Sequence, residues 1–300
     1  MMGQTVQFAT SSDAGESLSG SRSTKSRRTR SEVHALRAAI KAVVAENRPV
    51  TVRQAYYQLV SRGEIDKTEA AYKTVVRLLG IMRRERAIPF RWLADNTRWM
   101  HKPDTYSSLG AMLEYTQSTY RRAIWDEQDA YVEVWLEKDA LAGVLYPITS
   151  EFDVPLMVTR GYPSITFLHS AAETIAAIGK STFVYYFGDF DPSGLNIAVK
   201  VEEGLREFAP EADIHFDRVA VTAPQIESLN LPTRPTKTTD SRSKGFVGGS
   251  VEVDAIPPAH LKRLVRACIE QHVDERRLEQ LRRVEEQERA TLERMAEGFT

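Results

Sequence analysis

The sequence lacks the features of a secreted, membrane-spanning or zinc-dependent protein. Its 300 residues include one cysteine, Cys268, which excludes an intramolecular disulfide framework and a multi-cysteine metal cage. No apolar run approaches the roughly 18 residues that a membrane span needs, and no apolar stretch near the N-terminus indicates a secretion signal. The six histidines form no His-x-x-x-His pair, and Thr174 stands where a P-loop ending at Gly179 would need glycine. We therefore expect a cytoplasmic protein with no membrane contact.

The net charge of −1 hides a strong asymmetry along the chain. Residues 1–103 hold 19 Lys and Arg against 9 Asp and Glu, whereas residues 104–300 hold 21 against 32. Such a split suggests a basic half that meets a polyanion and an acidic half with a different task.

The basic half begins with a Ser-, Thr- and Gly-rich stretch over residues 1–30, which we expect to be a disordered basic tail. Its basic end would either contact phosphates or simply be solvated. Helical spacing then predicts three short helices, over 31–47, from Thr51 and from Thr68, and a short strand and turn follow Pro89. This order is typical of a winged helix-turn-helix domain, here over 31–103, whose third helix enters the major groove of DNA. On that helix we expect four basic residues to contact DNA, Lys73, Arg77, Arg83 and Arg84. Many such modules bind proteins instead, and that alternative stays open.

The acidic half alternates short apolar runs with helices. After a helical connector over 104–127, strands are expected at 131–136, 156–159, 183–187 and 214–221, with helices between them. This alternation predicts an α/β fold with a doubly wound parallel sheet over 128–258. A long surface loop is expected over 224–255, and a helical segment over 259–300 ends the chain.

Two of the predicted strands end in acids. Glu137 closes the first, and Asp189 and Asp191 follow the third in Gly-Asp-Phe-Asp-Pro-Ser-Gly. Sites in open α/β sheets form at the carboxyl ends of strands, and clustered carboxylates suit Mg²⁺. The alternative is that Asp191 only caps the next helix, with Pro192 as its first residue. Glu133 is the substitute ligand, and the neighbouring Lys138 either orients a phosphate or is solvated.

A tyrosine pair lies on the second predicted helix. Tyr56 falls on its apolar stripe and should pack in the core, whereas Tyr57 falls on another face with Arg53 one turn earlier. We expect Tyr57 to be partly exposed and a candidate phosphoryl acceptor, which needs a cation or base because its hydroxyl has a pKa near 10. The alternative is that Tyr57 only packs.

Together these motifs resemble one known family. Arg53-Gln-Ala-Tyr-Tyr57 in a winged helix, followed by Val-Trp-Leu-Glu137-Lys-Asp-Ala and Gly-Asp189-Phe-Asp191-Pro-Ser-Gly, is similar to the topoisomerase VI A subunit and the meiotic double-strand-break transesterase. Residues 160–164 and 219–231 extend the likeness, which covers about 31–260. The resemblance implies a winged-helix domain followed by a Toprim-like sheet domain.

The resemblance also implies an activity. Tyr57 would attack the DNA backbone and form a 5′-phosphotyrosyl link, Arg53 would stabilise the scissile phosphate, and Glu137, Asp189 and Asp191 would hold Mg²⁺. It implies a homodimer on double-stranded DNA, with each tyrosine meeting the partner's metal site, association with the nucleoid, and a separate ATPase subunit for strand passage. Two alternatives remain: a Toprim-type nuclease that uses water, and a non-catalytic DNA-binding component of a mobile element or defence system.

Overall fold

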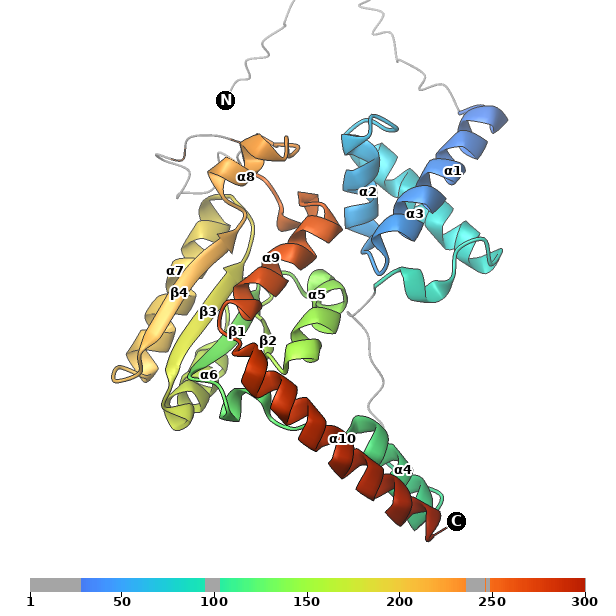
Figure 1. Cartoon of the computed structure of the whole chain (residues 1–300). Coiled ribbons are helices and arrows are strands. Elements are labelled where there is room, and N and C mark those ends of the chain that lie inside the picture. Colours follow the sequence, from blue (N-terminus) through green and yellow to red (C-terminus); the bar gives the residue numbers. More distant parts are fainter. Residues whose placement is uncertain (1–27, 95–102, 236–245, 247–248, 300) are drawn as a thin grey trace, which may run out of the picture.

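A group of three helices opens the described chain. The computed structural model describes residues 28–94, 103–235, 246 and 249–299. Helices α1 (Arg30–Asn47), α2 (Val52–Ser61) and α3 (Glu69–Arg84) form this three-helix group, which lies beside the sheet in Figure 1. The three predicted helices are confirmed. Apart from residues 28–30, the predicted tail lies outside the described residues.

The helices begin where the sequence supplies caps. Thr29, Thr51 and Thr68 each accept a hydrogen bond from a backbone N–H in the first turn, which satisfies one of the amides that a helix start leaves unpaired. At Thr51 the bond is reciprocal, because Gln54 Oε1 accepts from the Thr51 N–H at 3.0 Å.

The segment after Pro89 differs from the expected strand. Residues Phe90–Trp92 form a single 3-10 turn, closed by the bond from Trp92 N–H to the Pro89 carbonyl at 3.1 Å. Leu93 makes one isolated parallel bridge with Val50, because the chain at Val50 turns directly into α2 and leaves no room for a longer ladder. The strand prediction was wrong, and the predicted turn at 95–98 lies outside the described residues.

The acidic half contains a four-stranded parallel sheet in the order β2-β1-β3-β4. The strands are β1 (Ala130–Leu136), β2 (Leu156–Val158), β3 (Ser181–Phe187) and β4 (Ile214–Ala220). Helices α6 (Ile165–Ile178) and α7 (Pro192–Phe208) pack against each other, and α5 (Ala142–Thr149) packs against α9 (Pro258–Glu270). The α/β class, the parallel sheet and the helical C-terminus are thus confirmed.

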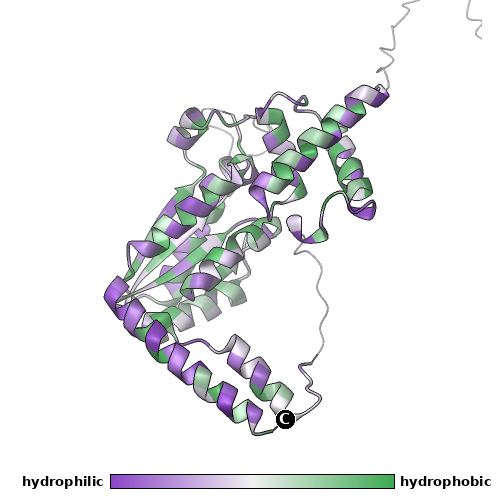
Figure 2. Cartoon of the chain, turned by 45° about the vertical axis from the view of Figure 1, so that its right-hand side comes forward, coloured by the Kyte–Doolittle hydropathy of each residue, from purple (hydrophilic) through white to green (hydrophobic). Residues whose placement is uncertain are grey.

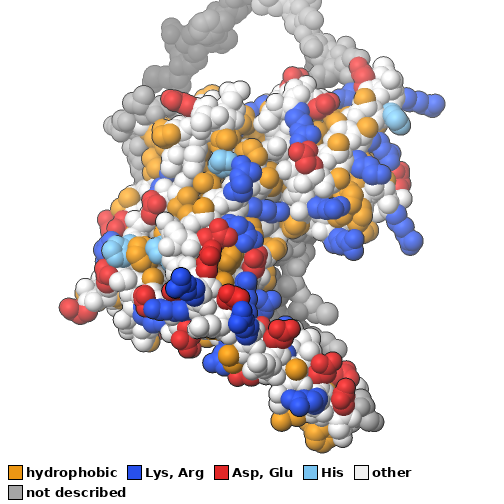
Figure 3. All heavy atoms as spheres, viewed as in Figure 1, with side chains coloured by type: hydrophobic (Ala, Val, Ile, Leu, Met, Phe, Trp, Pro, Cys, Tyr) orange, Lys and Arg blue, Asp and Glu red, His pale blue; other side chains and the backbone are white. Residues whose placement is uncertain are grey.

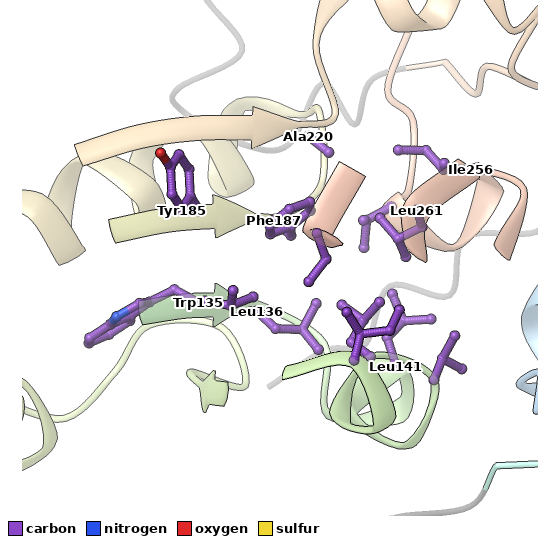
Figure 4. Packing of buried hydrophobic residues seen from close by; sticks show 14 of the residues in the cluster. Trp135, Leu136, Leu141, Tyr185, Phe187, Ala220, Ile256 and Leu261 are labelled. Carbon is purple, nitrogen blue, oxygen red and sulfur yellow. The ribbon is translucent and has the colours of Figure 1, made fainter. Parts of the chain in front are cut away.

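One part of the core lies at the carboxyl ends of β1 and β3. Figure 4 shows Leu136 and Phe187, the last residues of these strands, facing Leu141 beside α5 and Leu261 of α9. All four side chains are fully buried. This packing fixes the strand ends, and therefore the residues that follow them.

An arm of two helices extends from the sheet. Helix α10 (Glu275–Glu297) begins beside the sheet and extends away from it, running beside α4 (Leu109–Thr119) (Figures 1 and 2). Arg122, after α4, donates to Glu288 Oε1 at 2.9 Å and so ties the segment that follows α4 to α10. None of the described helices is both long and apolar enough to span a membrane.

The described parts of the segment expected as a long surface loop over 224–255 include a helix and buried residues. It contains α8 (Ala223–Ser228) and a 3-10 turn at Val253–Ala255, whose three residues are buried. Val251 pairs with Phe190 through two backbone hydrogen bonds of 2.8 and 3.0 Å. This part of the chain therefore returns to the sheet edge instead of remaining at the surface, and residues 236–245 lie outside the described ones.

Candidate functional site

The acids that end β1 and β3 lie at one edge of the sheet. Because Leu136 and Phe187 are in register on adjacent parallel strands, Glu137 and Asp189 follow them at the same edge. Glu137 Oε2 accepts a hydrogen bond from the Asp189 N–H at 2.9 Å. The predicted convergence of these two residues is confirmed.

Asp191 serves as the N-cap of α7. Its Oδ1 accepts from the Gly194 N–H at 2.7 Å, and Pro192 is the first helical residue. A Cβ at Gly194 would lie 2.3 Å from the Asp189 carbonyl oxygen, so only glycine lets the helix approach the acidic loop this closely. The predicted cap at Asp191 is confirmed, and Asp191 lines the same cavity as Asp189.

Lys138 places a positive charge among the acids of the site. Its Nζ lies 3.1 Å from Asp189 Oδ2, 2.9 Å from Glu252 Oε2 and 2.9 Å from Asp254 Oδ2. The side chain is mostly buried, and these carboxylates outweigh the effect of burial and raise its pKa. Lys138 is therefore an ion-paired residue, and its interpretation as a solvated side chain was wrong.

Burial and the charges of neighbouring groups shift the pKa values of the acids. Burial raises the pKa of Asp189 to about 7, Lys138 opposes this shift, and the charge of Glu137 adds to it. Burial also raises the pKa of Glu137. Carboxylates that are buried together in this way gain from a further positive charge.

The donor set fits Mg²⁺ in kind, because it consists of carboxylate oxygens and the ion needs only one or two protein carboxylates beside water and substrate. Within the described ranges, however, no three His, Cys, Asp or Glu side chains are arranged to hold a metal ion. The ammonium of Lys138 contacts Asp189 Oδ2, and Asp191 Oδ1 is used in the cap. The candidate ligands lie at one edge of the sheet, but the ammonium group of Lys138 occupies one of the carboxylate oxygens that a metal ion would bind.

Glu133, the substitute ligand, lies elsewhere. Its side chain is within the core, where Oε2 accepts from Trp135 Nε1 at 2.7 Å. Trp135 in turn packs against Phe167 of α6 with ring centroids 5.6 Å apart. Glu133 is thus a residue of the packed sheet.

Tyr57 is buried, contrary to the expected partial exposure. It is 1% exposed, and its hydroxyl accepts a hydrogen bond from Arg234 Nη2 at 2.7 Å. The helical pattern identified only one apolar face of α2, whereas its second face is covered by the turn at Val253–Ala255 and by Arg234. Tyr56 is in the core as predicted, and its hydroxyl donates to the Thr68 carbonyl at 3.2 Å.

The environment of the Tyr57 hydroxyl combines burial with positive charge. Burial raises the pKa of Tyr57 and the carboxylate of Glu252 adds to this, while Arg234, Arg53 and Lys138 act in the opposite direction. The hydroxyl is therefore neutral in this state, with cations placed to favour its deprotonated form.

Glu252 connects Tyr57's helix to the acids. Arg53 Nη1 donates to Glu252 Oε2 at 2.6 Å, and Arg234 Nη1 donates to Glu252 Oε1 at 2.6 Å. Lys138 binds the same Oε2 at 2.9 Å. One continuous network thus runs from the Tyr57 hydroxyl through Arg234, Glu252 and Lys138 to Asp189, all within one chain. The resemblance, in contrast, implies that the metal site facing each tyrosine belongs to the partner.

Two cavities flank this network. One of about 410 Å³ is lined by the acids and the cations, namely Arg53, Lys138, Asp189, Asp191, Arg234 and Glu252. The other, of about 580 Å³, lies on the side of Tyr56, Tyr57 and Tyr72. Arg53, Arg234 and Pro235 line both cavities.

The four basic residues expected to bind DNA lie on α3. Arg77 and Arg84 are exposed, and Lys73 is exposed with Glu69 3.7 Å away. Arg83 is half-buried, with its guanidinium carbon 4.5 Å from the Phe90 ring centroid. Figure 3 shows Lys and Arg side chains gathered over the three-helix group. This surface is basic, as expected from the charge of residues 1–103.

Three residues of the network were not predicted as site residues: Arg234, Glu252 and Asp254. Glu252 and Asp254 alternate with Val251 and Val253 in the sequence, which would place both acids on one side of an extended segment. In the structure a 3-10 turn carries Asp254, and both acids contact Lys138. That alternation was the available signal in a region expected to be a loop.

Comparison with known proteins places the chain in no family. No protein-family model matches the sequence, and no curated protein matches it.

Proposed function

We propose that this protein is a DNA-binding, Mg²⁺-dependent transesterase that cleaves a DNA strand by transferring its phosphate to Tyr57. The three-helix group would be a winged-helix module, and the sheet domain would be Toprim-like. The observation that carries the proposal is the network joining the Tyr57 hydroxyl to Asp189 through Arg234, Glu252 and Lys138. A purely structural tyrosine needs no such connection to an acidic sheet edge.

The chemistry is a phosphoryl transfer. The Tyr57 Oη attacks phosphorus and loses its proton, the bond from phosphorus to the deoxyribose O3′ breaks, and the departing O3′ takes up a proton. The products are a 5′-phosphotyrosyl link and a free 3′-hydroxyl, so the reaction is reversible. Glu137, Asp189 and Asp191 would hold Mg²⁺ only after their side chains move from the arrangement described above, in which no three acids converge on one point among the described residues. When bound, the ion would offset negative charge at the reacting phosphate.

The chain's own residues would prepare the nucleophile. Arg234 donates to Tyr57 Oη at 2.7 Å, and this bond strengthens as the oxygen gains negative charge. Arg53 lines the same cavity as Asp189 and is the residue placed to contact the phosphate. Both arginines keep donors beyond the one that each gives to Glu252.

The proposed partners follow from charge and chemistry. Double-stranded DNA would lie on the basic surface of α3, with Lys73, Arg77, Arg83 and Arg84 near its phosphates. Two copies of the chain would be needed to cut both strands, and a separate ATPase subunit would be needed for strand passage.

The experiment is a covalent-adduct assay. The protein is incubated with end-labelled duplex DNA and Mg²⁺, denatured in detergent, and examined for labelled DNA that migrates with protein. We expect adducts for the wild type and for Tyr56→Phe, which removes the neighbouring hydroxyl, and none for Tyr57→Phe. Adducts that persist in Tyr57→Phe would refute the nucleophile.

A second candidate is a nuclease in which water attacks the phosphate. The burial of Tyr57, at 1% exposure, favours it, because a nucleophile must reach its substrate. Free DNA ends without protein, retained in Tyr57→Phe and lost in Asp189→Asn, would establish this activity in place of the first.

A further inference from the structure

Glu252 lies at the centre of three cations. Its Oε2 accepts from Arg53 and Lys138, at 2.6 and 2.9 Å, and its Oε1 accepts from Arg234 at 2.6 Å. Burial alone would raise the pKa of Glu252, but Lys138 and Arg53 outweigh it and lower the pKa to about 2. The carboxylate is therefore ionised throughout the neutral range.

The backbone around Glu252 is fixed. Val251 exchanges two hydrogen bonds with Phe190, and the Val253 N–H donates to Asp189 Oδ1 at 2.8 Å. Val251 and Val253 are both buried. The side chain of Glu252 lines the cavity of about 410 Å³, which gives it space to turn while its backbone stays in place.

The arrangement of the three cations around Glu252 also suits a phosphate, and Lys138 is shared with Asp189 and Asp254. Two guanidinium groups and an ammonium converge on the two oxygens of Glu252, an arrangement that protein sites use for oxyanions. The side chains of Arg53 and Arg234 are 41% and 48% exposed, so both still reach solvent at the cavity. A tetrahedral group could replace the carboxylate without moving any of the three cations far.

We propose that Arg53, Arg234 and Lys138 form a binding site for a backbone phosphate of a nucleic acid, and that the Glu252 carboxylate occupies this site until substrate displaces it. The identity of the phosphate rests on the proposed function, whereas the anion site itself does not. Because Arg234 also bonds the Tyr57 hydroxyl, a phosphate in place of Glu252 lies next to that oxygen. Glu252 thus keeps the site closed to other anions.

The test is binding without cleavage. In EDTA, inorganic phosphate and a short DNA duplex are titrated separately into the whole protein, into Glu252→Gln and into Glu227→Gln by calorimetry. Glu227 is exposed on α8, and its substitution removes the same charge elsewhere. We expect Glu252→Gln to bind both ligands about tenfold or more tightly than the wild type. For Glu227→Gln we expect a change of about twofold or less, as for a distant surface charge.

A second substitution identifies the site. Arg234→Gln in the Glu252→Gln background should return phosphate affinity to the wild-type value, and the melting temperature of each variant reports whether it folds. If Glu252→Gln does not fold, the melting temperatures of the wild type and of Arg234→Gln are compared with and without added inorganic phosphate. Phosphate should raise the melting temperature of the wild type and should raise that of Arg234→Gln less.

Each other outcome overturns the inference. Unchanged phosphate affinity in folded Glu252→Gln shows that Glu252 holds no anion site. If Glu252→Gln binds inorganic phosphate more tightly than the wild type but binds the duplex no more tightly, the site accepts small phosphates and not a backbone phosphate. Because no cleavage occurs in EDTA, these results are independent of the adduct assay, which can fail or succeed separately.

Discussion

The buried carboxyl of Glu133 should make the free energy of unfolding depend on pH, and measuring that dependence tests whether this side chain lies in the core of the sheet. Burial raises the pKa of this carboxyl to about 7, although hydrogen bonds from Trp135 and Tyr131 oppose the shift. In the unfolded chain the same group has its ordinary pKa of 4.5. Between these values the folded protein holds a proton that the unfolded chain has released, so the free energy of unfolding falls as the pH rises.

The magnitude follows from the size of this shift. Each pKa unit corresponds to about 1.4 kcal/mol, so the wild type should lose roughly 3 kcal/mol from this group as the pH rises from below 4.5 to above 7. Glu133→Gln keeps an oxygen that can accept from Trp135 Nε1 and cannot ionise. The variant should therefore lack this loss and be the more stable protein at pH 8.

Urea unfolding across this pH range measures the effect. The difference in unfolding free energy between Glu133→Gln and the wild type isolates this carboxyl from Asp189 and Glu137, which titrate in both proteins. Glu211→Gln, at an exposed position, is the control and should follow the wild type. Parallel profiles for Glu133→Gln and the wild type would refute the reasoning, because they would show a carboxylate ionised in the folded state, as a metal ligand would be.

Three further substitutions, and a fourth that serves as a control, test individual contacts of the fold. Lys138→Met should lower the free energy of unfolding by about 3 kcal/mol or more, because it leaves three carboxylates without their shared cation; a urea-unfolding loss below about 1 kcal/mol would contradict this. Gly194→Ala should cost about 1–3 kcal/mol by thermal unfolding, because its Cβ meets the Asp189 carbonyl at 2.3 Å. Gly80→Ala, inside α3 with no atom within 4 Å of the new Cβ, should instead stabilise by up to about 1 kcal/mol. Thr51→Ala should cost about 1 kcal/mol in the same assay, and no loss would mean that the α2 cap is dispensable.

The parts of the fold that sequence predicted are those with local causes. Thr51 with Gln54, and Asp191 with Pro192, mark helix starts through contacts within one turn, and both were correctly placed. Glu137 and Asp189 could be brought together because parallel strands end at one edge. The 3-10 turn after Pro89 was missed because a single bridge to Val50 decides it.

The rest of the site depends on contacts between distant residues. Arg53 meets Glu252 across 199 positions, and Arg234 meets Tyr57 across 177. A helical pattern shows which face of α2 is apolar, and it contains no information about a segment that covers the other face. The burial of Tyr57 and the central place of Glu252 therefore emerged only from the structure.

The central claim is that Tyr57 becomes joined to DNA. Protein trapped on DNA in Mg²⁺ is digested with nuclease and protease, and its peptides are sequenced by mass spectrometry. The account predicts a nucleotide joined through its 5′-phosphate to Tyr57, on the peptide that contains both tyrosines, and none on Tyr56. A nucleotide on any other residue, or cleaved DNA with no modified peptide, would contradict it.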